Sequence, residues 1–191
     1  MNKEKMQKII LGTSNYENAL SGNTVSITGD GGNAWGYYGP AYKKLAPRLF
    51  TYKAYAEKYD ELLKQKDLEE YKKFRKQIED EYIKSYYETR LKNIEIIELL
   101  ELLKNNFGEE IILLCHEPIN EFCHRRIVAD YIELMTGVYI PEITIDKNKE
   151  VKKLLPIRYK NRLREIIGKE WKWKKNIKFI FLKIKKIMKK Y

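Results

Sequence analysis

The chain has few of the residues that stabilise small secreted proteins. Among its 191 residues only Cys115 and Cys123 are cysteines, whereas disulfide-stabilised scaffolds are rich in cysteine. The first residues are polar, and the apolar run Ile9-Ile10-Leu11 that follows is too short for a signal peptide or a membrane span. These absences predict a cytoplasmic protein. They also indicate that the two cysteines belong to a site rather than to a disulfide framework.

The sequence also lacks the short motifs of several well-defined enzyme classes. It contains no phosphate-binding Walker loop, no zinc-protease motif and no glycine fingerprint for dinucleotides. Hydrophobic residues make up 43% of the chain and charged residues 34%, which allows a packed core beneath a solvated surface. The length fits one domain with an appendage. The function must therefore be inferred from a less common arrangement of residues.

The net charge of +11 is concentrated near the C-terminus. Residues 151–191 carry 16 of the 38 basic residues but only 2 of the 27 acidic residues, a net charge of +14 that leaves −3 for residues 1–150. From Trp171 to Tyr191 apolar residues recur at helical spacing with lysines between them. Such a basic helix can pack on its own domain, bind nucleic acid or lie on an anionic membrane. We expect an α/β domain over residues 1–150 and a basic helical tail over 151–191.

Apolar periodicity predicts the order of strands and helices. Four segments have the short apolar or alternating pattern of strands, namely residues 8–12, 24–28, 110–115 and 138–145. Helical spacing predicts a long helical insertion over about residues 50–107, ended by Gly108, and another helix over residues 125–135. Strands that alternate with helices predict a small Rossmann-like three-layer domain with an open, mostly parallel sheet.

The segment over residues 115–126 follows the third predicted strand and opens the next helix. In open α/β sheets the ligand crevice lies beyond the carboxyl ends of the strands. Free backbone amides and the helix dipole at that point favour an anion and raise the thiolate fraction of a cysteine. The pattern predicts Cys123, His124 and Glu117 as catalytic residues and Arg125 as an anion-binding residue.

Other residues near the strand ends are candidate ligand-binding groups, and they are Thr13, Ser14, Tyr42, Lys44 and Cys115. Aromatic residues around the glycine-rich loop at 29–40 can stack on a base or a sugar. Each candidate also has a structural alternative. Cys115 can be a buried small residue at a strand end, His124 and Glu117 can hold the loop, and the tyrosines can cover the core. Arg126 is expected on the solvated face of the helix.

Two cysteines and two histidines are the ligand types of zinc sites. However, Cys115 and His116 are neighbours on a predicted strand, and neighbouring side chains on a strand point to opposite faces. Four ligands converging from this one loop would be awkward. The sequence therefore predicts no cofactor and favours a site without a metal, with a metal at the cysteines and histidines as the minor alternative.

The segment has the pattern Cys-x-Glu at Cys115 to Glu117, followed by Cys123-His124-Arg125 at the start of a helix. Further elements are Thr13-Ser14, Val25-Ser26-Ile27, the run from Tyr42 to Pro47, and the run from Val138 to Glu142. Together they resemble the family of domains of unknown function 488 over roughly residues 8–145. Thr13-Ser14 stands where many members of that family have Asp-x-Arg, so the chain resembles a Thr-Ser branch. The resemblance implies a fold and a site but no reaction.

Two functional hypotheses follow from this pattern. The first is an enzyme for a phosphate-bearing or nucleotide-like small molecule, or for nucleic acid. In it Arg125 holds an anion, Cys123 or His124 performs covalent or proton-transfer chemistry, and Thr13 and Ser14 orient the substrate. The second is a non-catalytic module that binds nucleic acid through the basic tail. A non-catalytic partner protein is a third alternative, and the expected partners are an anionic small molecule or a nucleic acid, with membrane contact through the tail as a further alternative.

Overall fold

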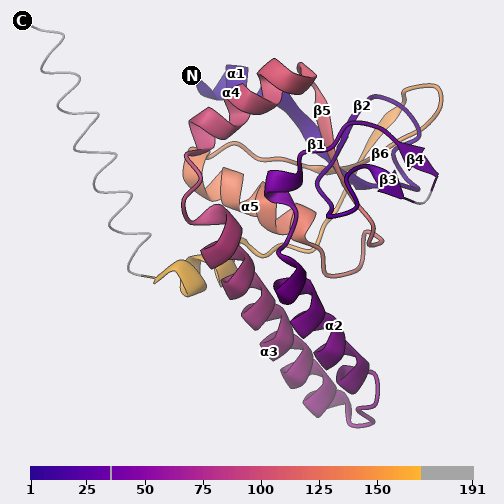
Figure 1. The fold of residues 1–191 in the computed structure, drawn as a ribbon, viewed down its shortest axis with the longest axis vertical. Coiled ribbons are helices and arrows are strands. Elements are labelled where there is room, and N and C mark those ends of the chain that lie inside the picture. Colours follow the sequence, from indigo (N-terminus) through magenta and orange to yellow (C-terminus); the bar gives the residue numbers. More distant parts are fainter. Residues whose placement is uncertain (35, 169–191) are drawn as a thin grey trace, which may run out of the picture.

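The computed structural model describes residues 1–34 and 36–168 (Figure 1). The helices are α1 (Lys3–Ile9), α2 (Leu49–Leu62), α3 (Leu68–Tyr86), α4 (Ile96–Phe107) and α5 (His124–Thr136). The strands are β1 (Ile10–Asn15), β2 (Asn23–Ser26), β3 (Asn33–Ala34), β4 (Tyr37–Tyr38), β5 (Ile111–Cys115), β6 (Glu142–Ile145) and β7 (Val151–Leu154). Two short turns are η1 (Lys43–Leu45) and the π-helical η2 (Tyr87–Leu91), and a helical segment covers residues 160–168.

Five strands form one open sheet in the order β2-β5-β1-β6-β7. The pairs β2–β5, β5–β1 and β1–β6 are parallel, and only β7 runs antiparallel, against β6. The predicted α/β fold with an open, mostly parallel sheet is therefore confirmed. In the register of the sheet, Thr13 lies opposite Leu113 and Asn15 lies opposite Cys115. The carboxyl ends of β1 and β5 consequently meet at one edge.

All five residues of β5 are buried, which explains the unbroken apolar run in its sequence. Ile111 and Leu113 face the main core, which the helices α1, α3, α4 and α5 share. Ile112 and Leu114 face a second, smaller cluster on the opposite side of the sheet. That cluster also contains Ile143 and Ile145 and is covered by Leu11, Tyr16, Ala19 and Tyr37.

The helical insertion divides into a hairpin of α2 and α3, which projects away from the sheet, and helix α4, which returns to it (Figure 1). The two helices of the hairpin are separated by a break near Lys66-Asp67. Asp67 caps α3 because its side chain accepts hydrogen bonds from the backbone N–H groups of Glu69 and Glu70. The buried residues of α3 gather in its second half, where the helix reaches the domain.

The first and last predicted strands need correction. Lys8 lies in α1 rather than in a strand, because Met6 and Ile9 give this polar segment one buried helical face, and β1 begins at Ile10. The expected strand over residues 138–145 forms only from Glu142 onward, since Pro141 cannot donate a ladder hydrogen bond. The antiparallel strand β7 and the small β3–β4 hairpin inside the glycine-rich loop were not expected.

The first part of the basic tail packs on the domain. Tyr159, Leu163 and Ile167 are buried in the main core, and the buried carboxylate of Asp130 pairs with Arg158. The helix expected from Trp171 to Tyr191 lies outside the described residues. Across the part of the chain that the structure describes, no helix has both the length and the apolar character needed to cross a membrane.

Helix α4 ends at Gly108, as predicted. Gly108 has φ 85° and ψ −155°, a region that residues with a side chain rarely enter. We expect Gly108→Ala to lower the free energy of unfolding by about 1–3 kcal/mol, measured by urea denaturation. Gly29→Ala is the matched control, because Gly29 has no atom within 4 Å of an added Cβ. An equal effect of the two substitutions would contradict the assignment of strain to Gly108.

Candidate functional site

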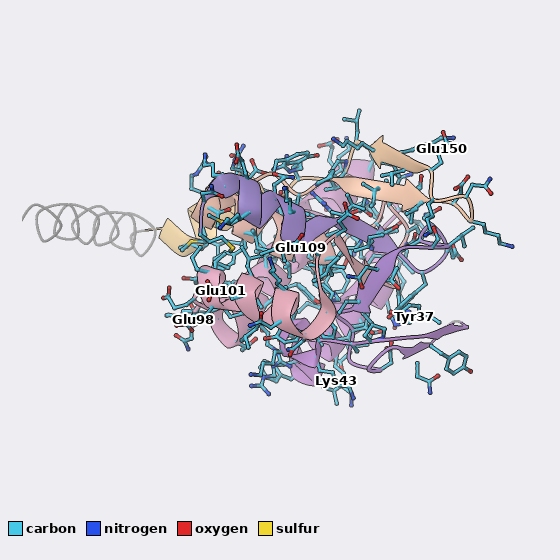
Figure 2. All side chains as sticks on the ribbon, turned by 90° about the horizontal axis from the view of Figure 1, so that it is seen from above. Tyr37, Lys43, Glu98, Glu101, Glu109 and Glu150 are labelled. Atoms are coloured by element: carbon cyan, nitrogen blue, oxygen red, sulfur yellow. The ribbon has the colours of Figure 1, made fainter. Side chains whose placement is uncertain are left out.

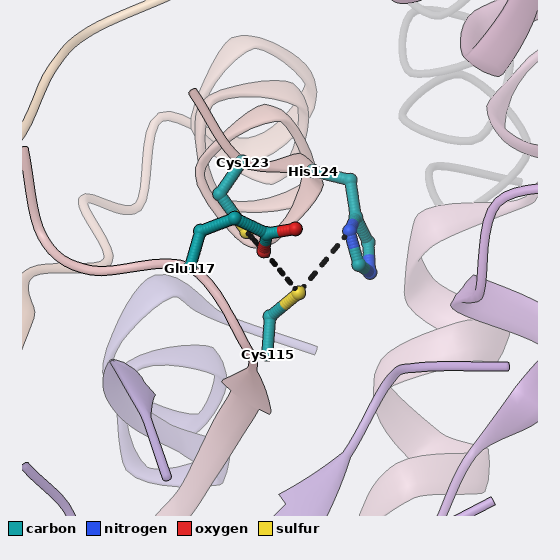
Figure 3. A group of neighbouring side chains, drawn as sticks. All are labelled: Cys115, Glu117, Cys123 and His124. Atoms are coloured by element: carbon teal, nitrogen blue, oxygen red, sulfur yellow. Dashed lines mark hydrogen bonds between the residues drawn. The ribbon is translucent and has the colours of Figure 1, made fainter. Parts of the chain in front are cut away.

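Four side chains converge beyond the carboxyl end of β5 (Figure 3). Cys115 is the last residue of β5, Glu117 lies in the following loop, Cys123 is the N-cap of α5 and His124 is its first residue. Their sulfur, oxygen and nitrogen ligand atoms all lie within 4.8 Å of one another. The loop therefore brings the three predicted catalytic residues and Cys115 into one cluster, which we call the Cys-Glu-His cluster.

Hydrogen bonds hold this cluster together. Oε2 of Glu117 lies within hydrogen-bond distance of both sulfurs, 2.8 Å from Cys115 Sγ and 2.9 Å from Cys123 Sγ. His124 Nε2 lies 2.8 Å from the carbonyl oxygen of Ile27. A carbonyl only accepts, so Nε2 carries a proton. The other ring nitrogen, Nδ1, faces Cys115 Sγ at 3.4 Å.

The two thiols have opposite pKa shifts. Burial raises the pKa of Cys115 well above its usual value, and contact with Cys123 and Glu117 raises it further. Burial alone would also raise the pKa of Cys123, but contact with Cys115 and the charges of Arg125 and His124 bring it well below its usual value. The negative charge of the metal-free cluster is therefore favoured on Cys123 rather than on Cys115.

Burial also moves the acid–base groups of the cluster. Burial, together with the negative charge of Cys123, raises the pKa of the Glu117 carboxyl to about 7. Burial opposes the charged form of His124, yet contact with Cys123 raises the pKa of the imidazole overall. Glu117 can therefore exchange a proton near neutral pH.

Part of the cluster lines a pocket of about 300 Å³, and we call this part the floor of the pocket. Glu117, Cys123 and His124 line it, together with residues of the helical insertion and the loop before α5, which are Tyr52, Tyr55, Ala56, Tyr59, Asp60, Tyr82, Glu121 and Phe122. The ring of Tyr55 lies 5.7 Å from that of Tyr59 in a stacked arrangement. The described lining residues include acidic groups but no lysine or arginine. The pocket is thus aromatic on its walls and polar at its floor.

A comparison with known protein families found a match, which includes the site loop and the pocket residues. Residues 43–132 match the family model described as "Domain of unknown function DUF488". These residues belong to the DUF488 family. No curated protein and no solved structure matches the chain. The segment from Cys115 to Arg126 lies inside the matched residues. Thr13-Ser14 lies outside them, so the assignment to the Thr-Ser branch stays a prediction.

The arginines of the DUF488 segment do not face the pocket. Arg125 is fully buried, and its guanidinium donates to the carbonyls of Glu117 at 2.7 Å and Pro118 at 3.3 Å and to the Glu142 carboxylate at 3.0 Å. All three guanidinium nitrogens are engaged. Arg125 therefore holds the site loop, and the anion that it binds is the Glu142 side chain.

Arg126 was expected on the solvated face of α5, and that expectation was wrong. Arg126 is 1% exposed. It donates to Thr13 Oγ1 at 2.6 Å and to the carbonyl of Ile140 at 3.2 Å, and it pairs with Glu142 at 3.5 Å. The reason is that α5 packs against the sheet from its first turn, so both arginines point toward β1 and β6.

The remaining predicted ligand-binding residues lie in other places. Thr13 is buried and donates to Glu142, and Ser14 Oγ is buried with no hydrogen-bond partner in the part of the chain that is described. Neither lines the pocket above Cys123. Tyr42 and Lys44 line a separate pocket of about 290 Å³ beside η2 and α4. The structure therefore brings together only the Cys-Glu-His cluster from the predicted set.

Sequence reasoning missed the walls of the DUF488 pocket. The helical spacing of Tyr52, Tyr55 and Tyr59 is that of packing residues, yet they line the pocket. A signal was present in the sequence, because these residues recur three and four positions apart and form one aromatic stripe along a helix. Helix α2 has only two buried residues, Thr51 and Leu62, so the stripe has little core to cover.

Proposed function

We propose that the chain is an enzyme that binds a planar, nucleotide-like group in the tyrosine-lined pocket. Proton-transfer or covalent chemistry then takes place at Cys123, His124 and Glu117. The observation that supports the proposal is that these three groups lie within 4.8 Å of one another and line the same pocket. Reactive groups that are packed together but open to a concave aromatic site are typical of enzymes.

The pocket walls suit the base or sugar of a nucleotide-like substrate rather than its phosphate. Tyrosine rings stack on planar bases and contribute about 1–3 kcal/mol per base. Asp60 and Glu121 make the walls acidic, and Arg125 is engaged elsewhere. The base or sugar of a nucleotide-like substrate therefore fits the pocket better than a phosphate does. We accordingly narrow the proposed substrate to a nucleoside-like molecule. The rival proposal, a nucleic-acid-binding module, depends on the basic tail over residues 151–191, of which residues 169–191 lie outside the described residues.

Access to the pocket can be tested with a small alkylating reagent. We expect iodoacetamide to modify Cys123 at least about tenfold faster than Cys115, because Cys123 lines the pocket and has the lowered pKa. Peptide mass spectrometry of the metal-free chain gives both rates. Cys115→Ser and Cys123→Ser are the matched variants, each of which leaves one thiol. Two thiols that react only when the chain unfolds would contradict an open site.

Turnover is tested with a panel of nucleosides and nucleotides, with the products detected by mass spectrometry. We expect a nucleoside to be converted, and Glu117→Gln to slow that conversion by about 10²–10⁴ fold, as loss of a proton-transfer group does. Glu121→Gln is the matched control, because Glu121 lines the same pocket outside the cluster. Equal rates for the two variants would contradict the role of Glu117.

A further inference from the structure

We infer that Cys115, Cys123 and His124 bind one zinc ion, with Glu117 beside its fourth, pocket-facing position. Two thiols, an imidazole and a carboxylate are the ligand types that zinc prefers. The inference deepens the proposed function and rests on it for the role of the pocket, since the ion would lie at the pocket floor. The ligand set itself is argued from the geometry of the cluster.

The distances fit a small cation. In a tetrahedral zinc site, bonds of about 2.0–2.3 Å place ligand atoms about 3.5 Å apart. Cys115 Sγ and His124 Nδ1 are 3.4 Å apart. The Glu117 oxygen lies nearer to both sulfurs, at 2.8 and 2.9 Å, because it is hydrogen-bonded to both of them. When zinc replaces the protons of the cluster, Glu117 is the group that has to move.

His124 is prepared as a ligand. Its Nε2–H donates to the carbonyl of Ile27, so that in the neutral imidazole the lone pair of Nδ1 faces Cys115 Sγ. Histidines that bind metals usually donate their second ring nitrogen to a backbone carbonyl or a carboxylate in this way. The imidazole is also 5% exposed and lies against the ring of Tyr86. Its orientation is therefore fixed before any ion binds.

The sequence argued against a metal site because the neighbours Cys115 and His116 would point to opposite faces of a strand. The structure removes this objection. His116 does point away from Cys115, toward Asp30. Glu117, rather than His116, is the fourth group of the cluster. Because Glu117 is two residues beyond Cys115 and Cys123 is next to His124, two short stretches supply all four groups. The awkward convergence expected for two cysteines and two histidines does not arise.

The charges around the cluster also suit a zinc dithiolate. Arg125 and Arg126 are buried and share a single carboxylate, that of Glu142, which leaves one positive charge in this group. Zinc with two thiolates, a neutral imidazole and the Glu117 carboxylate would carry one negative charge. Arg125 also interacts electrostatically with both Cys115 and Cys123. The positive charge of the arginine group therefore lies beside the zinc-bound cluster and would balance its negative charge.

Glu117 is less firmly held than the other three groups, which suits a carboxylate beside an open zinc position. It is half-buried on a loop, whereas Cys115, Cys123 and His124 are buried at the ends of β5 and α5. Catalytic zinc sites keep three protein ligands and one open position, and structural sites have four. A carboxylate that can leave the ion and accept a proton matches the first arrangement.

The experiment measures metal binding without any substrate. The full chain is stripped with a chelator, saturated with zinc, and assayed for zinc by atomic emission, and its affinity is measured by competition with a chromophoric chelator. We expect one zinc per chain. Cobalt(II) added instead should give the absorption of a tetrahedral site with sulfur-to-cobalt charge transfer. This spectrum uses the unaltered chain, so it does not depend on the folding of any variant.

Variants then identify the ligands. Cys115→Ser, Cys123→Ser and His124→Gln should weaken zinc binding more than about 100-fold, and Glu117→Gln less than about 100-fold, as losses beside a metal do. His116→Gln and Glu121→Gln are matched controls that should leave the affinity unchanged. A chain that binds no stoichiometric zinc, or a cobalt spectrum without sulfur charge transfer, would overturn the inference.

Glu117→Gln and the turnover assay separate the remaining outcomes. A loss of zinc in Glu117→Gln as large as in the cysteine variants would overturn the three-ligand arrangement and indicate a closed structural site. Zinc binding without turnover of any nucleoside would support the metal site and contradict the proposed function. A chain that binds no stoichiometric zinc but converts a nucleoside would overturn the inference and leave the proposed function standing.

Discussion

Glu142→Gln is expected to lower the free energy of unfolding by about 3–5 kcal/mol, the cost of breaking a buried charge pair. Glu142 is 2% exposed and is the carboxylate that pairs with both Arg125 and Arg126. Glutamine keeps the shape of the side chain but removes its charge. The two buried guanidinium groups would then share only neutral acceptors. The native state would therefore lose more free energy than a single hydrogen bond contributes.

Urea denaturation of the unaltered chain and of Glu142→Gln at the same pH measures this loss of free energy. Glu150→Gln is the matched control, because Glu150 is exposed at the β6–β7 turn on the outside of the molecule (Figure 2). An exposed charge of this kind contributes little, and we expect a change within about 0.5 kcal/mol. If Glu142→Gln were as mild as the control, the arginines would be satisfied by the Thr13 hydroxyl and the backbone carbonyls alone.

The sequence predicted the elements whose pattern is local. The apolar run over residues 110–115 becomes β5, because a strand buried on both faces needs no polar alternation. Gly108 ends α4 because only glycine accepts its backbone angles easily. The Cys-x-Glu and Cys-His pairs were predicted to share a site, and they do so because a loop between a strand end and a helix start is short.

What the sequence did not predict depends on contacts between distant residues. Arg126 looks like a surface residue until Thr13, more than a hundred positions away, is placed beside it. The tyrosines of α2 look like packing residues until the hairpin is folded back over the loop before α5. Composition and periodicity carry no information about these pairings, since they describe the neighbours of a residue along the chain and not across the fold.

Phe122→Ala is expected to lower the free energy of unfolding by about 3–5 kcal/mol, the cost of removing a buried aromatic side chain. Phe122 is 6% exposed and precedes Cys123 directly. Its ring centroid lies 5.1 Å from that of Tyr55, 5.2 Å from that of Tyr82 and 5.2 Å from that of Tyr159. One side chain therefore joins the site loop, the helical hairpin and the packed part of the C-terminal segment.

Because of this position, Phe122→Ala should change the site as well as the stability. Denaturation measures the loss of free energy of unfolding. The alkylation rate of Cys123 under native conditions shows whether the pocket wall has opened. We expect an opened wall to increase this rate. Phe122→Leu is the matched control, since a large apolar side chain fills most of the space and should cost less than about 1.5 kcal/mol. A large loss of stability with an unchanged alkylation rate would mean that Phe122 supports the core and not the pocket. In that case the tyrosines, rather than Phe122, would control access to Cys123.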